Sequence, residues 1–383
     1  MANEEEQKTP TQTWKTIGRV VLKAAALFIL LNLVFAWLKP LESLGQLSLY
    51  NWLLEGRERL PYGENSAESY NLSLDNVPAM FASHKVSVPK ADDEFRVLII
   101  GDSGAWGWLL ENEDTLAGQI NSGNYLTNDG RRIVAYNLGY PIMALSKDLL
   151  ILDAALAHDP DLVIWPVTLE SFPLEKQINP PLVANNPEPM LSLISRYDLA
   201  MDPNDPEFAE PGFLDETIVG RRRELADLLR LQLYGFSWHA TGVDQDIPDE
   251  FILRRSDFDE DLSWASFENP IQLTADETAL DLLATGVIHA GDVPVLIINE
   301  PIYISEGENS DIHYNAWYPR WAYDQYREMM EINATDRGWR YIDLWASIAA
   351  QEFTDSPVHL SQQGTSALVE LIMPHIMKAA NGS

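Results

Sequence analysis

Two short stretches near opposite ends of the chain contain residue types that can perform acyl chemistry. In "VLIIGDSGAWG" (97–107), Ser103 follows an apolar run and offers a hydroxyl nucleophile. In "EFTDSPVHLSQQG" (352–364), His359 can act as a base, and Asp355 can hold its imidazole in the required tautomer. A serine hydroxyl is a weak nucleophile until a neighbouring base takes its proton. Each stretch alone also fits an ordinary turn or helix start, so the chemistry requires a fold that brings them together.

The elements between these stretches predict such a fold. Runs rich in Val, Ile and Leu alternate with segments of helical spacing, which is typical of a parallel sheet covered on both faces. We therefore expect an α/β domain with three layers, α/β/α, around a mostly parallel, doubly wound sheet whose functional loops lie at the carboxyl ends of the strands. The expected strands are 95–103, 131–141, 160–170, 293–303 and 339–345, and the expected helices are 114–124, 145–159, 320–338 and 362–380. Helix-capping residues are expected at Asp114 or Thr115, at Ser146 and at Ser361.

The strand-ending Gly-Asp-Ser and the late His-Leu-Ser-x-x-Gly element together resemble the SGNH (GDSL-type) hydrolase superfamily. The resemblance covers roughly residues 95–170 and 293–380. It implies serine ester chemistry, either hydrolysis or acyl transfer, with Ser103 as the nucleophile and His359 as the base. It implies Asp355 as the acid, although the family usually places this residue three positions before the His and here the spacing is four. A Ser–His dyad therefore stays open as an alternative.

The resemblance also suggests where an oxyanion would be stabilised. After the second strand, "VAYNLGYPIMAL" (134–145) offers the backbone N–H of Gly139 or, in the usual family register, that of Ile142. The family normally supplies an Asn side chain after the third strand, but this chain has Thr168 and Glu170 there. The Thr168 hydroxyl can donate a hydrogen bond, whereas an ionised Glu170 would repel an oxyanion and is retained only as a substrate-lining candidate.

Further substrate-lining candidates come from two later segments. The segment "HYNAWYPRWAYDQY" (313–326) combines aromatic rings with polar groups, and we expect His313, Trp317 and Arg320 to face a substrate such as a sugar ring. Packing of these rings onto the core is the alternative. Glu300 ends the expected fourth strand and is a further candidate.

Charge and composition exclude several classes of protein. Asp and Glu number 58 against 26 Lys and Arg, and the net charge of -32 would repel nucleic acid. The absence of Cys excludes disulfide scaffolds and thiolate metal sites. The acidic run 244–262 lacks the spacing of a calcium loop. We therefore expect no metal and no cofactor.

The N-terminal region predicts attachment to a membrane. The segment 17–38 is apolar enough to span a bilayer, and basic residues precede it. The positive-inside rule then places residues 1–16 in the cytoplasm and the rest of the chain outside it. No small-residue cleavage site follows, so an uncleaved anchor is favoured over a cleaved signal peptide or a buried soluble helix.

The expected domain organisation follows from these segments. Residues 39–94 are expected as a stalk and irregular wrap, and 95–383 as the catalytic domain. Within that domain, 173–272 interrupts the alternation of strands and helices and is interpreted as a lid-like insertion with a helix at 215–236.

These observations predict an extracytoplasmic, membrane-anchored serine esterase or O-acyltransferase. Its expected partner is an acylated cell-surface glycan or other ester substrate, and analogy with anchored SGNH-like proteins adds a multispanning acyl-donor membrane protein. The alternative is a non-catalytic SGNH-like protein for glycan binding or assembly, which the missing Asn and the irregular Asp–His spacing favour.

Overall fold

A sheet of five parallel strands forms the centre of the protein, in the order β2-β1-β3-β4-β5. The computed structural model describes residues 10–63, 65–209 and 211–382. The strands are β1 (Glu94–Gly101), β2 (Arg132–Gly139), β3 (Leu162–Val167), β4 (Val295–Asn299) and β5 (Arg340–Asp343). They coincide with the five expected strands, although every one is shorter. The predicted α/β class is confirmed.

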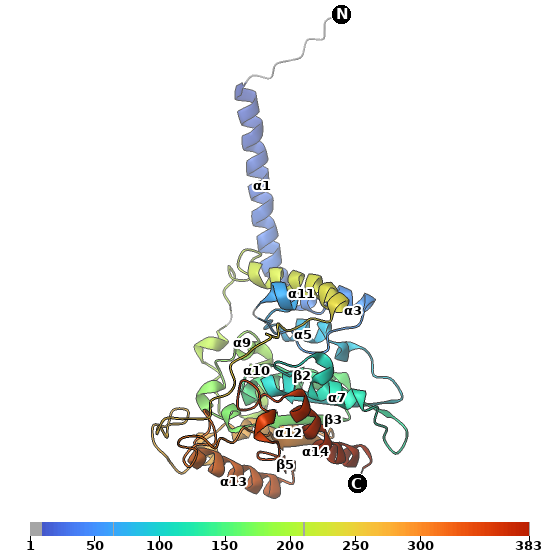
Figure 1. The fold of residues 1–383 in the computed structure, drawn as a ribbon. Coiled ribbons are helices and arrows are strands. Elements are labelled where there is room, and N and C mark those ends of the chain that lie inside the picture. The colour runs from blue at the N-terminus through green and yellow to red at the C-terminus, as the bar shows by residue number, and fades with distance from the viewer. Residues whose placement is uncertain (1–9, 64, 210, 383) are drawn as a thin grey trace, which may run out of the picture.

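Helices cover both faces of the sheet because the strands are apolar on both sides (Figure 1). Along β1, Val97 and Ile99 face one core, and Leu98 and Ile100 face the other. The first core is closed by α7 and α14, and the second by α8, α12 and α13. These helices are α7 (Leu116–Ser122), α8 (Leu145–Ala155), α12 (Leu280–His289), α13 (Arg320–Arg337) and α14 (Gln362–Ala380). Three layers result, with the carboxyl ends of the strands at one edge.

The predicted helix starts are partly correct. Thr115 caps α7 by accepting a hydrogen bond from Gly118 N at 3.1 Å, and Ser361 caps α14 by accepting one from Gly364 N at 3.0 Å. The prediction for Ser146 is wrong, because Ala144 occupies the cap of α8 and Ser146 Oγ donates instead to the carbonyl of Gln177. A backbone carbonyl from a distant loop thus competes with the local capping role.

The segment that follows α1 (Pro10–Leu38) packs onto the sheet domain. It contains α2 (Leu41–Gly45), α3 (Leu49–Leu53), α4 (Ser66–Ser69) and α5 (Val77–Ser83). Leu60, Met80 and Val86 are fully buried in the same core as the sheet. Residues 60–63 and 65–86 therefore pack with the sheet domain, which together with them we call the head, and they do not form a free-standing spacer.

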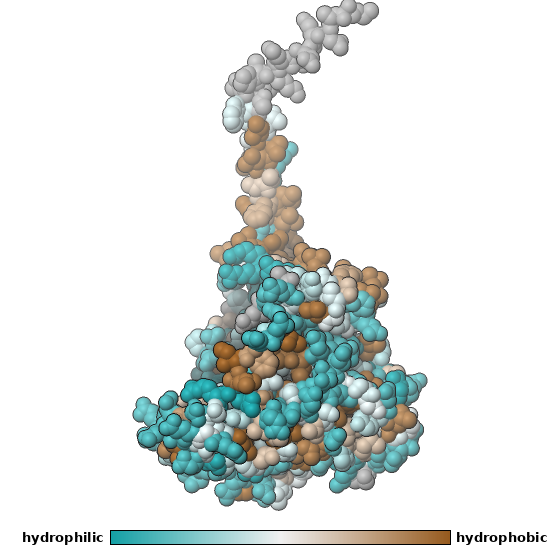
Figure 2. Space-filling model, in the orientation of Figure 1, coloured by the Kyte–Doolittle hydropathy of each residue, from teal (hydrophilic) through white to brown (hydrophobic). Residues whose placement is uncertain are grey.

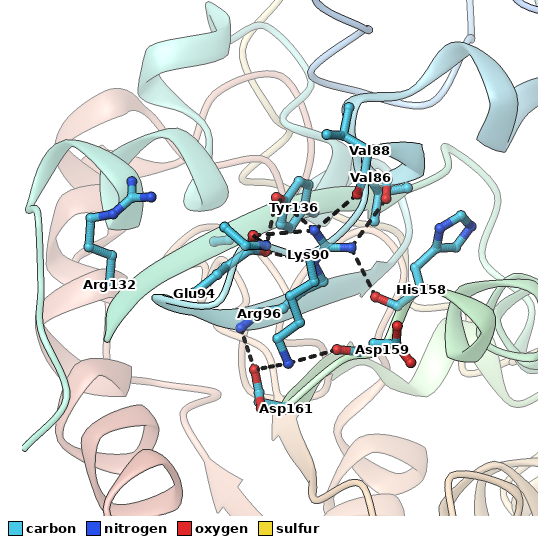
Figure 3. Close-up of polar contacts among 12 residues, drawn as sticks. Val86, Val88, Lys90, Glu94, Arg96, Arg132, Tyr136, His158, Asp159 and Asp161 are labelled. Carbon is cyan, nitrogen blue, oxygen red and sulfur yellow. Dashed lines mark hydrogen bonds and ion pairs between the residues drawn. The ribbon is translucent and has the colours of Figure 1, made fainter. Parts of the chain in front are cut away.

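Arg96 attaches the end of the segment after α1 to the sheet at the amino ends of its strands (Figure 3). Its Nε donates to Glu94 Oε1 at 2.6 Å, and its Nη atoms donate to the carbonyls of Val86 and Val88 at 3.3 and 3.2 Å. A further bond reaches the carbonyl of His158 at 2.9 Å. Because this cluster lies at the amino ends of the strands, it stabilises the wrap at the edge opposite the loops expected to be functional.

The helix α1 projects from the head (Figure 1), and its surface is strongly hydrophobic (Figure 2). Over the described part of the chain, Trp14–Leu38 is the one helix long and apolar enough to cross a membrane. Membrane anchors and signal sequences share this length and composition.

Among the described residues of the expected insertion there are three α-helices and a long irregular segment. The helices are α9 (Pro181–Ala184), α10 (Pro187–Tyr197) and α11 (Arg222–Thr241). The predicted helix start at Asp215 is wrong, because Asp215 Oδ2 accepts from Gly212 N at 3.0 Å and turns the chain before α11 begins. Further along, Arg254 N donates to Thr354 O at 3.1 Å, so the irregular part runs beside the loop that contains Asp355.

Candidate active site

Ser103 stands at a sharp turn between β1 and a short helix. The strand ends at Gly101, whose backbone has a φ of 139°, a value that residues other than glycine rarely adopt. Asp102 then caps α6 (Ser103–Trp106) by accepting a hydrogen bond from Gly104 N at 2.8 Å. This turn places the Ser103 hydroxyl at the carboxyl edge of the sheet, as the sequence predicts.

The loop before α14 brings a histidine and a carboxylate to this hydroxyl. His359 Nε2 lies 2.8 Å from Ser103 Oγ, and His359 Nδ1 lies 2.7 Å from Asp355 Oδ1. Thr354 N donates to His359 O at 2.9 Å, and Ser356 Oγ accepts from His359 N at 3.2 Å, so the loop closes on itself. The four-residue Asp–His spacing is therefore compatible with a direct contact. The structure brings together all three residues proposed for catalysis.

The electrostatics of the contacts from Ser103 through His359 to Asp355 set the direction of proton transfer. Burial raises the pKa of Asp355, but the hydrogen bond and the charge of His359 outweigh burial and lower the pKa below the ordinary aspartate value. An ionised carboxylate only accepts hydrogen bonds, so His359 Nδ1 carries the proton that faces Asp355. Nε2 is then free to accept the Ser103 proton. Trp108 stacks on the imidazole with ring centroids 6.1 Å apart.

The three oxyanion candidates lie near the strand ends, but each donor is engaged within the protein. Gly139 N donates to Asn137 Oδ1 at 3.1 Å, and Ile142 N donates to Tyr140 O at 2.6 Å. The Thr168 hydroxyl is fully buried and donates to Tyr318 Oη at 2.9 Å. The Ile142 contact spans only two residues and lies in a half-buried turn, so of the three it is the easiest to exchange for a substrate oxygen.

Gly139 has a structural role that the sequence did not predict. A Cβ atom at this position would lie 2.4 Å from Trp106 N, so only glycine lets β2 approach α6 this closely. Asn137 was also not predicted; its Nδ2 donates to Trp106 O at 3.0 Å. Together they fix the short helix that begins with Ser103.

A pocket opens beside His359 and is also lined by Trp108 and Val358. Of the five substrate-lining candidates, Glu300 alone lines it. Glu170 forms an ion pair with Lys176. His313 contacts Asp261 O at 2.6 Å, and Arg320 stacks on Tyr314.

The aromatic segment packs largely as core. Tyr318, Tyr323 and Tyr326 are fully buried, and Trp317 packs against the same apolar cluster. Core packing, the alternative to sugar stacking, therefore describes these rings.

Four buried ionisable groups lie beneath the Ser103 turn. Lys147 Nζ donates to Gly101 O at 2.7 Å and pairs with Asp148. Burial raises the pKa of Asp102, although the positive charge of Lys147 partly lowers it again. Burial and then the charges of Asp102 and Asp148 raise the pKa of Glu300 well above the ordinary glutamate value. Burial and the neighbouring carboxylates therefore favour the protonated form of Glu300, which lies under the nucleophile turn. No motif in the sequence marked Lys147 or Asp148 as part of the site.

No protein-family model and no curated protein matches this chain by sequence. Similar solved structures include a carbohydrate acetylesterase family member from Sinorhizobium meliloti, with 12% identity, 75% of this chain and 99% of that chain covered, and a TM-score of 0.33. Another is the inhibitor-bound aryl esterase of M. smegmatis, with 10% identity, 74% and 99% coverage, and a TM-score of 0.34.

Proposed function

We propose that the protein is a serine esterase or O-acyltransferase that works through an acyl-enzyme on Ser103. The observation that supports this proposal most strongly is the continuous line from Ser103 Oγ through His359 to Asp355, with contacts of 2.8 and 2.7 Å. The three groups come from the two ends of the sheet domain, 256 and 4 residues apart in sequence. Such a line is what nucleophilic acyl chemistry requires.

The proposed reaction has two halves that share the same proton carrier. His359 Nε2 takes the Ser103 proton as Oγ attacks the ester carbonyl, and Asp355 stabilises the imidazolium. When the tetrahedral intermediate collapses, the C–O bond to the leaving alcohol breaks, and the alcohol takes the proton from His359. Water or a sugar hydroxyl then attacks the acyl-Ser103 ester by the reverse sequence. In the first half we propose that the Ile142 N–H turns from Tyr140 O to the oxyanion.

The proposed setting is the outer face of a membrane, with the N-terminus in the cytoplasm. Asn32 in α1 is buried, and its Oδ1 accepts from Val219 N of the head at 3.1 Å. A segment removed on export would have no reason to form such a contact, which supports an uncleaved anchor. An acylated surface glycan is the proposed substrate class, and a multispanning acyl donor is the proposed partner if the reaction is transfer.

One observation favours a second candidate function. Because all three oxyanion donors are engaged in the protein, a non-catalytic glycan-binding or assembly protein would also fit the site. The two candidates are separated by turnover of short aryl esters by the full chain, measured for the wild type and for Ser103→Ala. We expect turnover that Ser103→Ala abolishes. An inactive wild type that retains binding of an acylated glycan would support the second candidate. A glycan acceptor included in the assay then distinguishes transfer from hydrolysis, because transfer yields acylated glycan in place of free acid.

A further inference from the structure

The end of α1 enters the head among a group of large exposed apolar side chains, which we call the collar. In Figure 2 hydrophobic atoms continue from α1 onto the adjoining surface of the head. The collar comes from three segments that are separate in sequence: α2–α3 with the turn between them, the turn before α11, and α11 itself. Its members are Leu44, Leu47, Leu49, Trp52, Leu53, Phe213, Leu214, Val219, Leu229, Leu233 and Phe236.

The helix α11 has two apolar faces. One is buried against the rest of the protein, and the other is largely exposed, although Phe236 contacts the Tyr50 ring edge-on with centroids 6.3 Å apart. Leu231, Gly235 and Trp238 are buried against the head. Leu229, Leu233 and Phe236 follow the same four- and three-residue spacing but are offset by two positions, so they lie on nearly the opposite side of the helix. Leu233 is 58% exposed. Solvent-facing helix surfaces are normally polar, so this second face indicates a contact with something apolar outside the protein.

The collar segments are held together as one surface. Gln232 Oε1 accepts from Leu49 N at 2.7 Å, and Gln232 Nε2 donates to Leu47 O at 3.2 Å. Figure 1 shows α11 and α3 beneath the end of α1. The turn before α11 lies against the side of α1. Its Val219 N donates a hydrogen bond to Asn32, which stands more than one helical turn before α1 ends at Leu38. In that turn Leu214 is 77% exposed.

We propose that the collar lies in the outer interface of the bilayer that α1 spans. Trp14–Leu38 has 25 residues, a length of about 37 Å, whereas a hydrocarbon core is about 30 Å thick. The surplus allows the last turns of α1, and the collar around them, to lie at the level of the lipid headgroups. An apolar helix face lying in the membrane plane at this depth is the arrangement of an interfacial amphipathic helix.

Charge supports the same occupant. The whole chain has a net charge of -32, but segments 39–53 and 213–241 contain as many basic as acidic residues. Arg222, Arg223 and Arg230 are exposed on α11. The collar segments therefore carry no net charge, and anionic headgroups would not repel them as they would the acidic chain as a whole.

Docking of the collar would also fix the orientation of the active site. Directly after α11, Gln245 Oε1 accepts from Leu109 N at 2.7 Å. Asp244 pairs with buried Arg59, which donates to Gly107 O at 2.8 Å. These bonds hold the loop containing Trp108, the ring that stacks on His359. A head seated on the bilayer therefore presents its site at a fixed height above the membrane.

The test uses the full chain, which has no cysteines and so accepts single labels cleanly. Leu233→Cys and the control Ile332→Cys are each labelled with a nitroxide in vesicles of phosphatidylcholine and phosphatidylglycerol. Ile332 is 52% exposed and lies on α13, at the end of the head far from α1 (Figure 1). We expect the ratio of oxygen to nickel-chelate accessibility to be several-fold higher at position 233 than at position 332.

The proposal rests on α1 being an anchor, so vesicle flotation is measured on the same samples. Flotation with equal ratios at both positions would overturn the collar and leave the anchor intact. Failure to float would overturn both. Spin–spin broadening at position 233 that disappears on dilution with unlabelled protein would show that a second copy covers the face, which also overturns the proposal. Ester turnover of the same samples reports separately on Ser103 chemistry.

Discussion

The contact between Asp355 and His359 makes a quantitative prediction about Asp355→Asn. The change keeps the size of the side chain but removes its charge, and its amide can donate to Nδ1. His359 then loses both the partner that stabilises its protonated form and the group that fixes its tautomer. We expect kcat for aryl ester turnover to fall steeply while KM changes little.

The size of the effect follows from the geometry. Unit charges about 4 Å apart interact by about 4 kcal/mol at an effective dielectric constant of about 20. The Nδ1–Oδ1 contact is 2.7 Å, and the Asp355 side chain is 27% exposed, so solvent screens part of this energy. Each 1.36 kcal/mol corresponds to a factor of ten in rate, which gives about 10³ from charge alone. A wrong tautomer extends the loss toward about 10⁴.

The assay is steady-state hydrolysis of a short aryl ester across the neutral and alkaline pH range. Asp336→Asn is the matched control, because Asp336 is exposed on α13 and away from the site. Activity of Asp355→Asn within tenfold of the wild type at neutral pH would refute the role of Asp355 and leave a Ser–His dyad as the mechanism.

Three further predictions concern the groups that support Ser103. Gly139→Ala should reduce turnover at least tenfold and lower stability by about 1–3 kcal/mol in denaturant unfolding, because its Cβ would meet Trp106 N at 2.4 Å; unchanged kinetics would contradict the close approach. Glu300 has a raised pKa, so the folded state holds a proton that the unfolded state releases, and stability falls as pH rises above the unfolded glutamate value. Glu300→Gln should remove up to about 1.4 kcal/mol per pH unit of that slope in unfolding measured at several pH values, and an unaltered slope would contradict a neutral Glu300. Asp244→Asn leaves Arg59 buried without its partner and should cost about 3 kcal/mol of unfolding free energy, whereas a change under 1 kcal/mol would show that the pair is not buried in solution.

The sequence was most informative where local chemistry decides the structure. An apolar run of strand-forming residues that ends in Gly-Asp-Ser favours a strand followed by a turn, so the position of Ser103 could be predicted. The closing helix was predicted at its observed bounds because Ser361 caps it with a hydrogen bond to Gly364 that is purely local.

Contacts between distant segments were not accessible in this way. Ser146 has the right residue type and position for a helix cap, but its hydroxyl donates a hydrogen bond to the carbonyl of Gln177 instead. Aromatic residues such as Tyr318 and Tyr323 fit either a sugar-stacking surface or a packed core. Only their complete burial shows that they belong to the core. The second apolar face of α11 was hidden because buried and exposed apolar residues alternate along one helix and look alike in sequence.

The central claim, that Ser103 forms an acyl-enzyme with His359 as its base, is tested most directly by a fluorophosphonate probe. The full chain is treated with the probe, and the adduct is mapped by mass spectrometry of its peptides. The account predicts a single adduct on Ser103 in the wild type, loss of the adduct in Ser103→Ala, and strongly slowed labelling in His359→Ala. A wild-type protein that folds but does not react, or an adduct on another residue that persists in Ser103→Ala, would contradict it.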